Sequence, residues 1–221
     1  MGLLKGYWRH IARGRKGYTL LEVAAVVAIT ATLGAVVVPI AIDKVGEGKK
    51  SAARQDCQQI GGAISAFYKD VGLWPAMDDS GTFNNIDILT SGNDQGVALF
   101  SEDSHDPAQS DDINGDWGGD ADLLDNHLVT DSPYGASSGY VSRGSVNWKG
   151  PYSESFKKRD PWGNNYLVYV RAMHTPTTGA DKEYGWIISA GPNATLETGV
   201  LDFILKGDDI GFPLYSAETG H

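Results

Sequence analysis

The sequence predicts an α+β protein in which a long N-terminal helix, its first half transmembrane, packs against a small antiparallel β-sheet head with a long loop-rich insertion. Three observations predict this. Residues 23–42 form an uncharged apolar run, an amphipathic helical pattern continues to Val71, and short β-branched and aromatic segments follow near the C-terminus. The 221 residues suffice for one ordinary domain plus an anchoring segment.

Charge is unevenly distributed along the chain. The 18 basic and 28 acidic residues give a net charge of −10. Residues 1–17 hold five basic residues and no acid, which leaves −15 on the remainder. So acidic a body repels phosphates, which argues against a nucleic-acid partner. Basic residues ahead of the apolar run predict a cytoplasmic N-terminus and an exported C-terminal body.

The apolar run is long enough to cross a membrane, since twenty helical residues span about 30 Å. A plain signal anchor is the simplest alternative, while a cleaved secretory signal would have a shorter apolar core. Glu22 directly precedes this apolar run. A carboxylate near lipid needs a positively charged partner, and the run contains no basic residue that could be one. Cleavage after Gly17 would create an α-ammonium group on Tyr18, one helical turn from Glu22.

The segment from Gly17 to Glu22, GYTLLE, resembles the leader junction of type IV pilins and type II secretion pseudopilins. The resemblance implies that a prepilin peptidase cleaves after Gly17 and methylates the new N-terminus at Tyr18. It further implies that Glu22 meets the terminal amine of a neighbouring subunit as a filament assembles in the bacterial inner membrane. Tyr18 departs from the phenylalanine usual in the family, which bears on methylation more than on cleavage.

Two residues within the apolar run weaken a helix. Proline at position 39 lacks a backbone donor, and glycine at position 34 has low helix propensity. The resemblance implies that the stretch from Gly34 to Pro39 unwinds on assembly, and an ordinary kink in a transmembrane helix is the alternative.

The second half of the helix, residues 43–72, shows one apolar stripe at spacings of three and four residues, typical of a helix packed on a core. The stripe comprises Ala53, Cys57, Ile60, Ile64, Phe67 and Val71. Cys57 is the only cysteine, so an intramolecular disulfide is excluded, and we interpret it as a small apolar residue on the helix face.

A Gly- and Asp-rich stretch follows, with few apolar residues over more than seventy positions, which is typical of an insertion or a functional loop. Within it, residues 121–129 (ADLLDNHLV) suggest a short helix. The sequence therefore divides into a basic leader (1–17), a transmembrane and assembly helix (18–42), an amphipathic continuation (43–72), an acidic insertion (73–147) and a β-sheet head with its C-terminal loop (148–221).

Two motifs in the head resemble signatures of the major pseudopilin of type II secretion. They are WKGPY at residues 148–152 and DPWGNNY at residues 160–166. Asp-Pro-Trp-Gly predicts a turn. Strands are expected at 166–170 (YLVYV), 183–189 (EYGWIIS) and 200–205 (VLDFIL).

The resemblance also implies a calcium ion in the C-terminal loop, held by carboxylates and carbonyls. Asn193, Asp208 and Asp209 are the matching residues. The family has an aspartate where this chain has Asn193, so a lower calcium affinity is expected.

A second acidic motif, Asp112, Asn114 and Asp116, has the first three ligand positions of an EF-hand-like loop. Trp117 and Leu123 occupy the positions where that loop needs its glycine and its bidentate acid, so a solvated acidic loop is the alternative.

These features predict a structural subunit without catalytic residues, which polymerises with copies of itself into a pseudopilus for type II secretion. The resemblance implies minor pseudopilins, the prepilin peptidase and an inner-membrane assembly platform as further partners, and a periplasmic or extracellular head. One alternative is a type IV pilin or minor pilin of an extracellular fibre, although pilins often carry a C-terminal disulfide that this chain lacks. An exported, signal-anchored enzyme or calcium-binding lectin is the alternative from another class.

Overall fold

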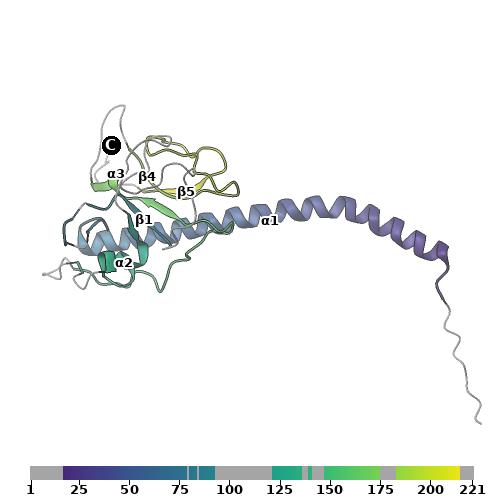
Figure 1. Ribbon diagram of the computed structural model, residues 1–221, viewed down its shortest axis with the longest axis horizontal. Coiled ribbons are helices and arrows are strands. Elements are labelled where there is room, and N and C mark those ends of the chain that lie inside the picture. Colours follow the sequence, from purple (N-terminus) through teal and green to yellow (C-terminus); the bar gives the residue numbers. More distant parts are fainter. Residues whose placement is uncertain are drawn as a thin grey trace, which may run out of the picture. The chain divides into compact units, whose positions relative to one another are not determined.

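A computed structural model describes residues 17–78, 80–83, 85–92, 121–135, 139–140, 147–174 and 183–214. The chain divides into two compact units, Met1–Val45 and Gly46–His221. The first contains the start of the long helix α1, and the second, here called the head, contains the rest of α1 and the sheet (Figure 1).

Helix α1 runs from Leu20 to Val71 as one element of 52 residues, as the sequence predicts. Glycines and Pro39 lie inside it without ending it. It ends where Gly72 adopts a positive φ of 72° and donates its N–H to the Tyr68 carbonyl at 2.8 Å. A left-handed glycine after the last helical residue is a common helix stop, because glycine has no Cβ to clash there.

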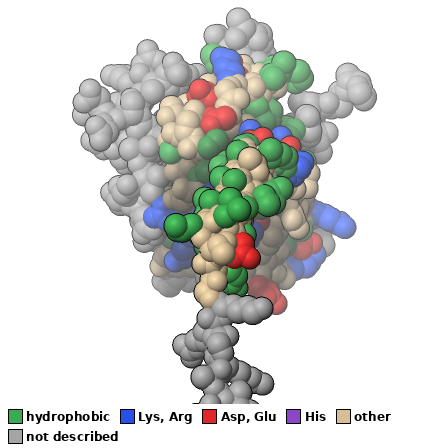
Figure 2. All heavy atoms as spheres, turned by 90° about the vertical axis from the view of Figure 1, so that its right-hand side faces the viewer, with side chains coloured by type: hydrophobic (Ala, Val, Ile, Leu, Met, Phe, Trp, Pro, Cys, Tyr) green, Lys and Arg blue, Asp and Glu red, His purple; other side chains and the backbone are tan. Residues whose placement is uncertain are grey.

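The first part of α1 is apolar and uncovered. An 18-residue window with a mean hydropathy of 2.4 has none of its residues buried within the structure, and α1 is long and apolar enough to cross a membrane. Figure 2, viewed from the side where α1 begins, shows hydrophobic side chains in green at the end of the helix that faces the viewer. An uncovered apolar helix requires hydrocarbon or a protein partner around it.

The described part of the head contains one five-stranded sheet in the order β2-β1-β3-β4-β5. Its strands are β1 (Ile88–Thr90), β2 (Ala121–Leu123), β3 (Leu167–Tyr169), β4 (Gly185–Ser189) and β5 (Ile210–Leu214). The pairs β1–β3, β3–β4 and β4–β5 are antiparallel, whereas β1 and β2 are parallel. The sheet is therefore mixed rather than wholly antiparallel.

The predicted apolar stripe of α1 is buried in the main core, together with one face of the sheet. Alternate strand residues divide between the two faces, as the period of two requires. Val168 and Ile187 face the main core, while Leu167 and Ile188 belong to a second, smaller apolar cluster. Cys57 is fully buried, and burial raises the pKa of its thiol to about 12, so it acts as a small apolar residue.

The prediction of a third strand at residues 200–205 was wrong. Residues 200–205 form a loop in which Leu201, Phe203 and Ile204 are exposed. Asp202 accounts for the difference, because its carbonyl accepts the Trp186 indole N–H at 2.9 Å and its carboxylate accepts the Gly199 N–H at 2.7 Å. The strand that pairs with β4 is β5 instead.

The described end of the insertion contributes to the head. Strand β2 leads directly into α2 (Leu124–Leu128), which confirms the short helix expected there, and a 3-10 turn η1 (Pro133–Gly135) follows. Helix α3 (Arg171–His174) comes after β3. Leu124 and Leu128 are fully buried in the main core, so this segment is part of the head rather than an appendage.

Candidate functional site

The first candidate site is the start of α1, where Thr19 and Glu22 bond reciprocally. Both the Thr19 N–H and the Thr19 hydroxyl donate to Glu22 Oε2, at 2.9 and 3.0 Å. The Glu22 N–H donates back to Thr19 Oγ1 at 3.2 Å. This arrangement is a capping box, which satisfies backbone donors that a helix start leaves unpaired.

The capping box gives Glu22 a partner that sequence reasoning missed. The pattern Thr-x-x-Glu before an apolar run is a capping signal that is present in the sequence. The carboxylate of an isolated subunit is therefore hydrogen-bonded, without being neutralised. Gly17 and Tyr18 precede the helix and are exposed, so the expected cleavage point lies in accessible, non-helical chain.

Gly34 and Pro39 lie within the uninterrupted helix. A Cβ added at Gly34 would meet no atom within 4 Å, so packing in the isolated chain does not require glycine there. The expectation that this stretch unwinds on assembly stays a prediction.

The DPWG motif forms the turn that the sequence predicts, organised by the buried Asp160. Asp160 Oδ1 accepts the N–H groups of Trp162 and Asn164 at 2.9 and 2.8 Å. Its other oxygen accepts the Ser189 hydroxyl at 2.5 Å. The turn is thereby fixed to the end of β4.

The DPWG turn is also joined to the C-terminal loops. Asn164 Nδ2 donates to the Gly191 carbonyl at 3.2 Å. Gly191 has a φ of 67°, and a Cβ on it would lie 2.4 Å from the Asp208 carbonyl oxygen. Three segments that the sequence singled out, around residues 160–164, 189–193 and 207–209, therefore meet in one place.

The WKGPY motif connects the end of α1 with α2. The Trp148 indole N–H donates to the His127 carbonyl at 3.0 Å, and the Tyr152 N–H donates to the Leu128 carbonyl at 2.8 Å. Lys149 pairs with Asp70 at 2.9 Å. Both signature motifs therefore hold segments of the head together.

The expected calcium residues lie in the C-terminal loops. Asp209 is buried, and its Oδ2 accepts the N–H groups of Glu197 and Thr198 at 2.9 and 2.7 Å. Asp208 Oδ2 accepts the Asn193 N–H at 3.1 Å, and the Asp208 N–H donates to Glu197 at 2.9 Å. Glu197 is a neighbouring carboxylate that sequence reasoning missed.

One oxygen of each aspartate, Asp208 Oδ1 and Asp209 Oδ1, is buried without a hydrogen-bond partner in the described structure. Burial raises the pKa of Asp209, and the charge of Glu197 adds to this, against the opposing hydrogen bonds from Thr198 and the backbone. Within the described residues no group of three His, Cys, Asp or Glu side chains is arranged to hold a metal ion. A cation here would depend on Asn193 and backbone carbonyls as well. Asp112, Asn114 and Asp116 lie outside the described residues.

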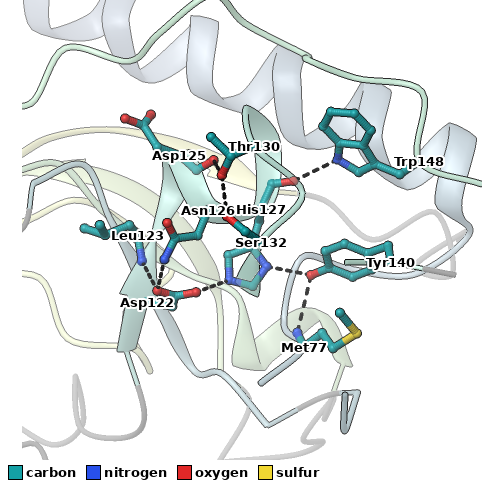
Figure 3. Close-up of polar contacts among 10 residues, drawn as sticks. All are labelled: Met77, Asp122, Leu123, Asp125, Asn126, His127, Thr130, Ser132, Tyr140 and Trp148. Carbon is teal, nitrogen blue, oxygen red and sulfur yellow. Dashed lines mark hydrogen bonds and ion pairs between the residues drawn. The ribbon is translucent and has the colours of Figure 1, made fainter. Parts of the chain in front are cut away.

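A buried polar network joins β2, α2 and residue 140 (Figure 3). His127 Nε2 lies 2.9 Å from Asp122 Oδ2, and His127 Nδ1 lies 2.6 Å from the Tyr140 hydroxyl oxygen. That oxygen also accepts the Met77 N–H at 3.4 Å. Both ring nitrogens of His127 therefore have a polar partner, Asp122 at Nε2 and the Tyr140 hydroxyl at Nδ1.

This acid–imidazole–hydroxyl order is superficially that of a catalytic triad. His127 is fully buried, and Asp122 and Tyr140 are no more than 6% exposed. Burial also raises the pKa of Tyr140, so its phenol stays protonated. We assign the network a structural role, that of fixing α2 to the loop after α1.

Comparison with known proteins gives one informative likeness. The chain is 39% identical over 62 residues to the fimbrial protein EcpC of Eikenella corrodens. The match covers 28% of this chain and 40% of that relative, so the chain spans less than half of the relative's length. No family model matches the chain, and no solved structure matches it significantly. The long apolar helix and the small mixed sheet form an α+β, pilin-like layout.

Proposed function

We propose that this protein is a structural subunit that polymerises with copies of itself into a filament anchored in the bacterial inner membrane. The observation that carries the proposal is the division of α1 into two parts with different surroundings. Its first part is apolar and uncovered, while its second part forms the core of a folded head. Burying such helices against one another in a filament would remove a large apolar surface from lipid and water. The likeness to a fimbrial protein supports the same role.

In this proposal a prepilin peptidase removes residues 1–17, and the new amine of Tyr18 becomes the partner of Glu22 in an adjacent subunit. The carboxylate then exchanges its bonds to Thr19 for a charged partner. A charge pair in a low-dielectric filament core is favourable where an unpaired carboxylate is costly.

Three variants separate the charge of Glu22 from its capping role. Glu22→Gln keeps an acceptor for the capping box but removes the charge, and Glu22→Ala removes both. Thr19→Val removes the capping hydroxyl and keeps the charge. We expect both Glu22 variants to be cleaved normally and to lose filament assembly, while Thr19→Val still assembles. Cleavage is measured by mass spectrometry of the N-terminus and assembly by electron microscopy of sheared filaments. Normal assembly by Glu22→Gln would refute the charge pair.

We further propose that the filament is the pseudopilus of a type II secretion system, on the basis of the WKGPY and DPWGNNY motifs. The fimbrial relative favours the second candidate, a pilus fibre outside the cell. Deletion of the gene distinguishes them. Loss of exoprotein secretion without loss of surface fibres supports the pseudopilus, and the opposite result supports the pilin.

We propose that calcium binds at the C-terminal loops through Asp208, Asp209 and Asn193. The unpartnered buried oxygens of the two aspartates support the proposal, because carboxylate oxygens are the ligands that calcium prefers. Millimolar calcium should raise the melting temperature of the full chain in detergent, and Asp209→Asn should abolish that rise. An equal rise in the variant, or none in the wild type against a chelator control, would remove the site. No catalytic function is proposed for the chain.

A further inference from the structure

The turn after β4 contains a sequence pattern that the filament role does not use. Asn193-Ala194-Thr195 has the form Asn-x-Thr with a residue other than proline in the middle, the acceptor pattern for N-linked glycosylation. It is the only Asn-x-Ser or Asn-x-Thr pattern in the 221 residues. The pattern alone is short, so the local structure has to decide whether a sugar could be attached.

The three residues are exposed on a tight turn of the head. The Ala194 N–H donates to the Gly191 carbonyl at 3.4 Å, and Ala194 itself has a φ of 58°, which is unusual for a residue with a Cβ. A hydrogen bond from the Asn193 N–H to the Asp208 carboxylate, at 3.1 Å, fixes the backbone of the turn to the loop that contains Asp208. The turn therefore presents its side chains on a fixed support.

The Asn193 side chain is oriented by its own turn. Its Oδ1 accepts the Thr195 N–H at 2.7 Å, which closes an Asx-turn. The carboxamide nitrogen Nδ2 has no hydrogen bond in the described structure, so it is the free end of the side chain. The hydrogen bond to Oδ1 holds the asparagine next to Thr195, the residue whose hydroxyl completes the acceptor pattern.

We propose that Asn193 is an N-glycosylation site of the exported head. The inference rests on the proposed export, since the sugar would be attached on the far side of the membrane. The donor is a membrane-lipid pyrophosphate sugar, and an oligosaccharyltransferase of the same cell supplies the catalysis. Asn193 Nδ2 forms a bond to the anomeric carbon and loses one proton, while the bond from that carbon to the pyrophosphate oxygen breaks and the lipid pyrophosphate leaves.

A sugar at this position would change the surface of the head without entering its core. Asn193 donates only its backbone N–H to the loop beneath, and that bond survives glycosylation. Glycosylation and calcium binding would use different atoms of the Asn193 carboxamide, because the sugar is attached to Nδ2 whereas a metal would bind Oδ1.

The test is mass spectrometry of the full chain purified from the membranes of the cells that make it. Trypsin cleavage after Lys182 and Lys206 releases residues 183–206 as one peptide with no internal Lys or Arg. We expect most of this peptide to carry the added mass of one or more sugar residues. Fragmentation that preserves glycosidic bonds should locate the sugar on Asn193.

Three variants serve as controls. Thr195→Ala and Asn193→Gln should give only the unmodified peptide, while Thr195→Ser, which preserves the pattern, should keep the modification. A sugar located on Thr195 or Thr198, or modification that persists in Thr195→Ala, would overturn the inference.

Export is measured separately, by adding protease to spheroplasts and following digestion of the head. An unmodified peptide from a protease-accessible head overturns the glycosylation and leaves the proposed export intact. An inaccessible head overturns the export, and the inference falls with it.

Discussion

Lys157 Nζ lies 2.6 Å from Asp56 Oδ1 and 2.9 Å from Asp56 Oδ2, which joins α1 to a loop 101 residues further along the chain. The same carboxylate accepts the hydroxyl of the fully buried Tyr166 at 2.8 Å. Asp56 is buried on the helix, whereas the Lys157 side chain is mostly exposed. The bond to Tyr166 is therefore the better shielded of the two.

Asp56→Ala should lower the free energy of unfolding of the head by about 1–3 kcal/mol, because it leaves the Tyr166 hydroxyl buried without an acceptor. Lys157→Met, which keeps much of the side-chain volume, should cost less, because an ion pair with a mostly exposed lysine contributes little. Urea unfolding of the full chain in detergent, followed by tryptophan fluorescence, measures both. A larger loss in Lys157→Met than in Asp56→Ala would contradict this ranking.

Tyr140→Phe tests the buried network. It removes the hydroxyl that accepts from Met77 and bonds to His127 Nδ1, and leaves both groups buried without that partner. We expect a loss of about 1–3 kcal/mol in the free energy of unfolding. Tyr68→Phe is a matched control, because Tyr68 is partly exposed and stacks on Trp74. Equal stability of the two variants would show that the network contributes nothing measurable.

The adjacent glycines of α1 should respond in different ways to alanine. A Cβ at Gly62 would meet no atom within 4 Å, so Gly62→Ala should raise stability by about 0.5–1 kcal/mol through helix propensity. A Cβ at Gly61 would lie 3.0 Å from Phe212 and 3.1 Å from Ile187. Gly61→Ala should therefore gain less or lose stability. Thermal unfolding compares the two, and a larger gain at Gly61 would refute the packing argument.

Asp209 predicts a pH dependence in calcium-free buffer. Because burial raises the pKa of Asp209 in the folded state, ionisation favours unfolding. The contribution of Asp209 to stability should fall as the pH rises from the ordinary aspartate pKa of about 3.9 to the higher pKa that Asp209 has in the folded state. Asp209→Asn keeps an oxygen for the two backbone donors and cannot ionise. The difference in unfolding free energy between wild type and variant should shift in favour of the variant as pH rises, and a constant difference would contradict the assignment.

Much of the fold could be predicted because the signals are long. The apolar run and the stripe from Ala53 to Val71 specify one helix over many turns, and the burial of that stripe confirms the interpretation. The DPWG turn was also predictable, since proline and glycine restrict the backbone directly. Glu22 is conspicuous in the sequence because a carboxylate is costly in lipid, whereas its bonds to Thr19 become evident only in the structure.

The sheet was harder to predict because its strands are short. Residues 200–205 are more apolar than β5, whose sequence IGFPL contains a glycine and a proline. The Asp202 carbonyl accepts the Trp186 indole N–H, a tertiary hydrogen bond that no local sequence pattern reports. A local bond from the Gly199 N–H to the Asp202 carboxylate adds a turn at the start of this segment. The parallel pairing of β2 with β1 depends on a connection through the insertion, which sequence periodicity cannot trace.

Strand β2 belongs to the insertion and covers the edge of β1, so removing the insertion would affect the solubility of the head. Among the described strands it forms one edge of the sheet, and the opposite edge is β5, which contains Pro213. A shortened protein that lacked β2 would leave the backbone groups of β1 open to pairing with any extended chain nearby. Trimming the insertion to simplify the head is therefore expected to cause aggregation, unless the cut spares residues 121–128.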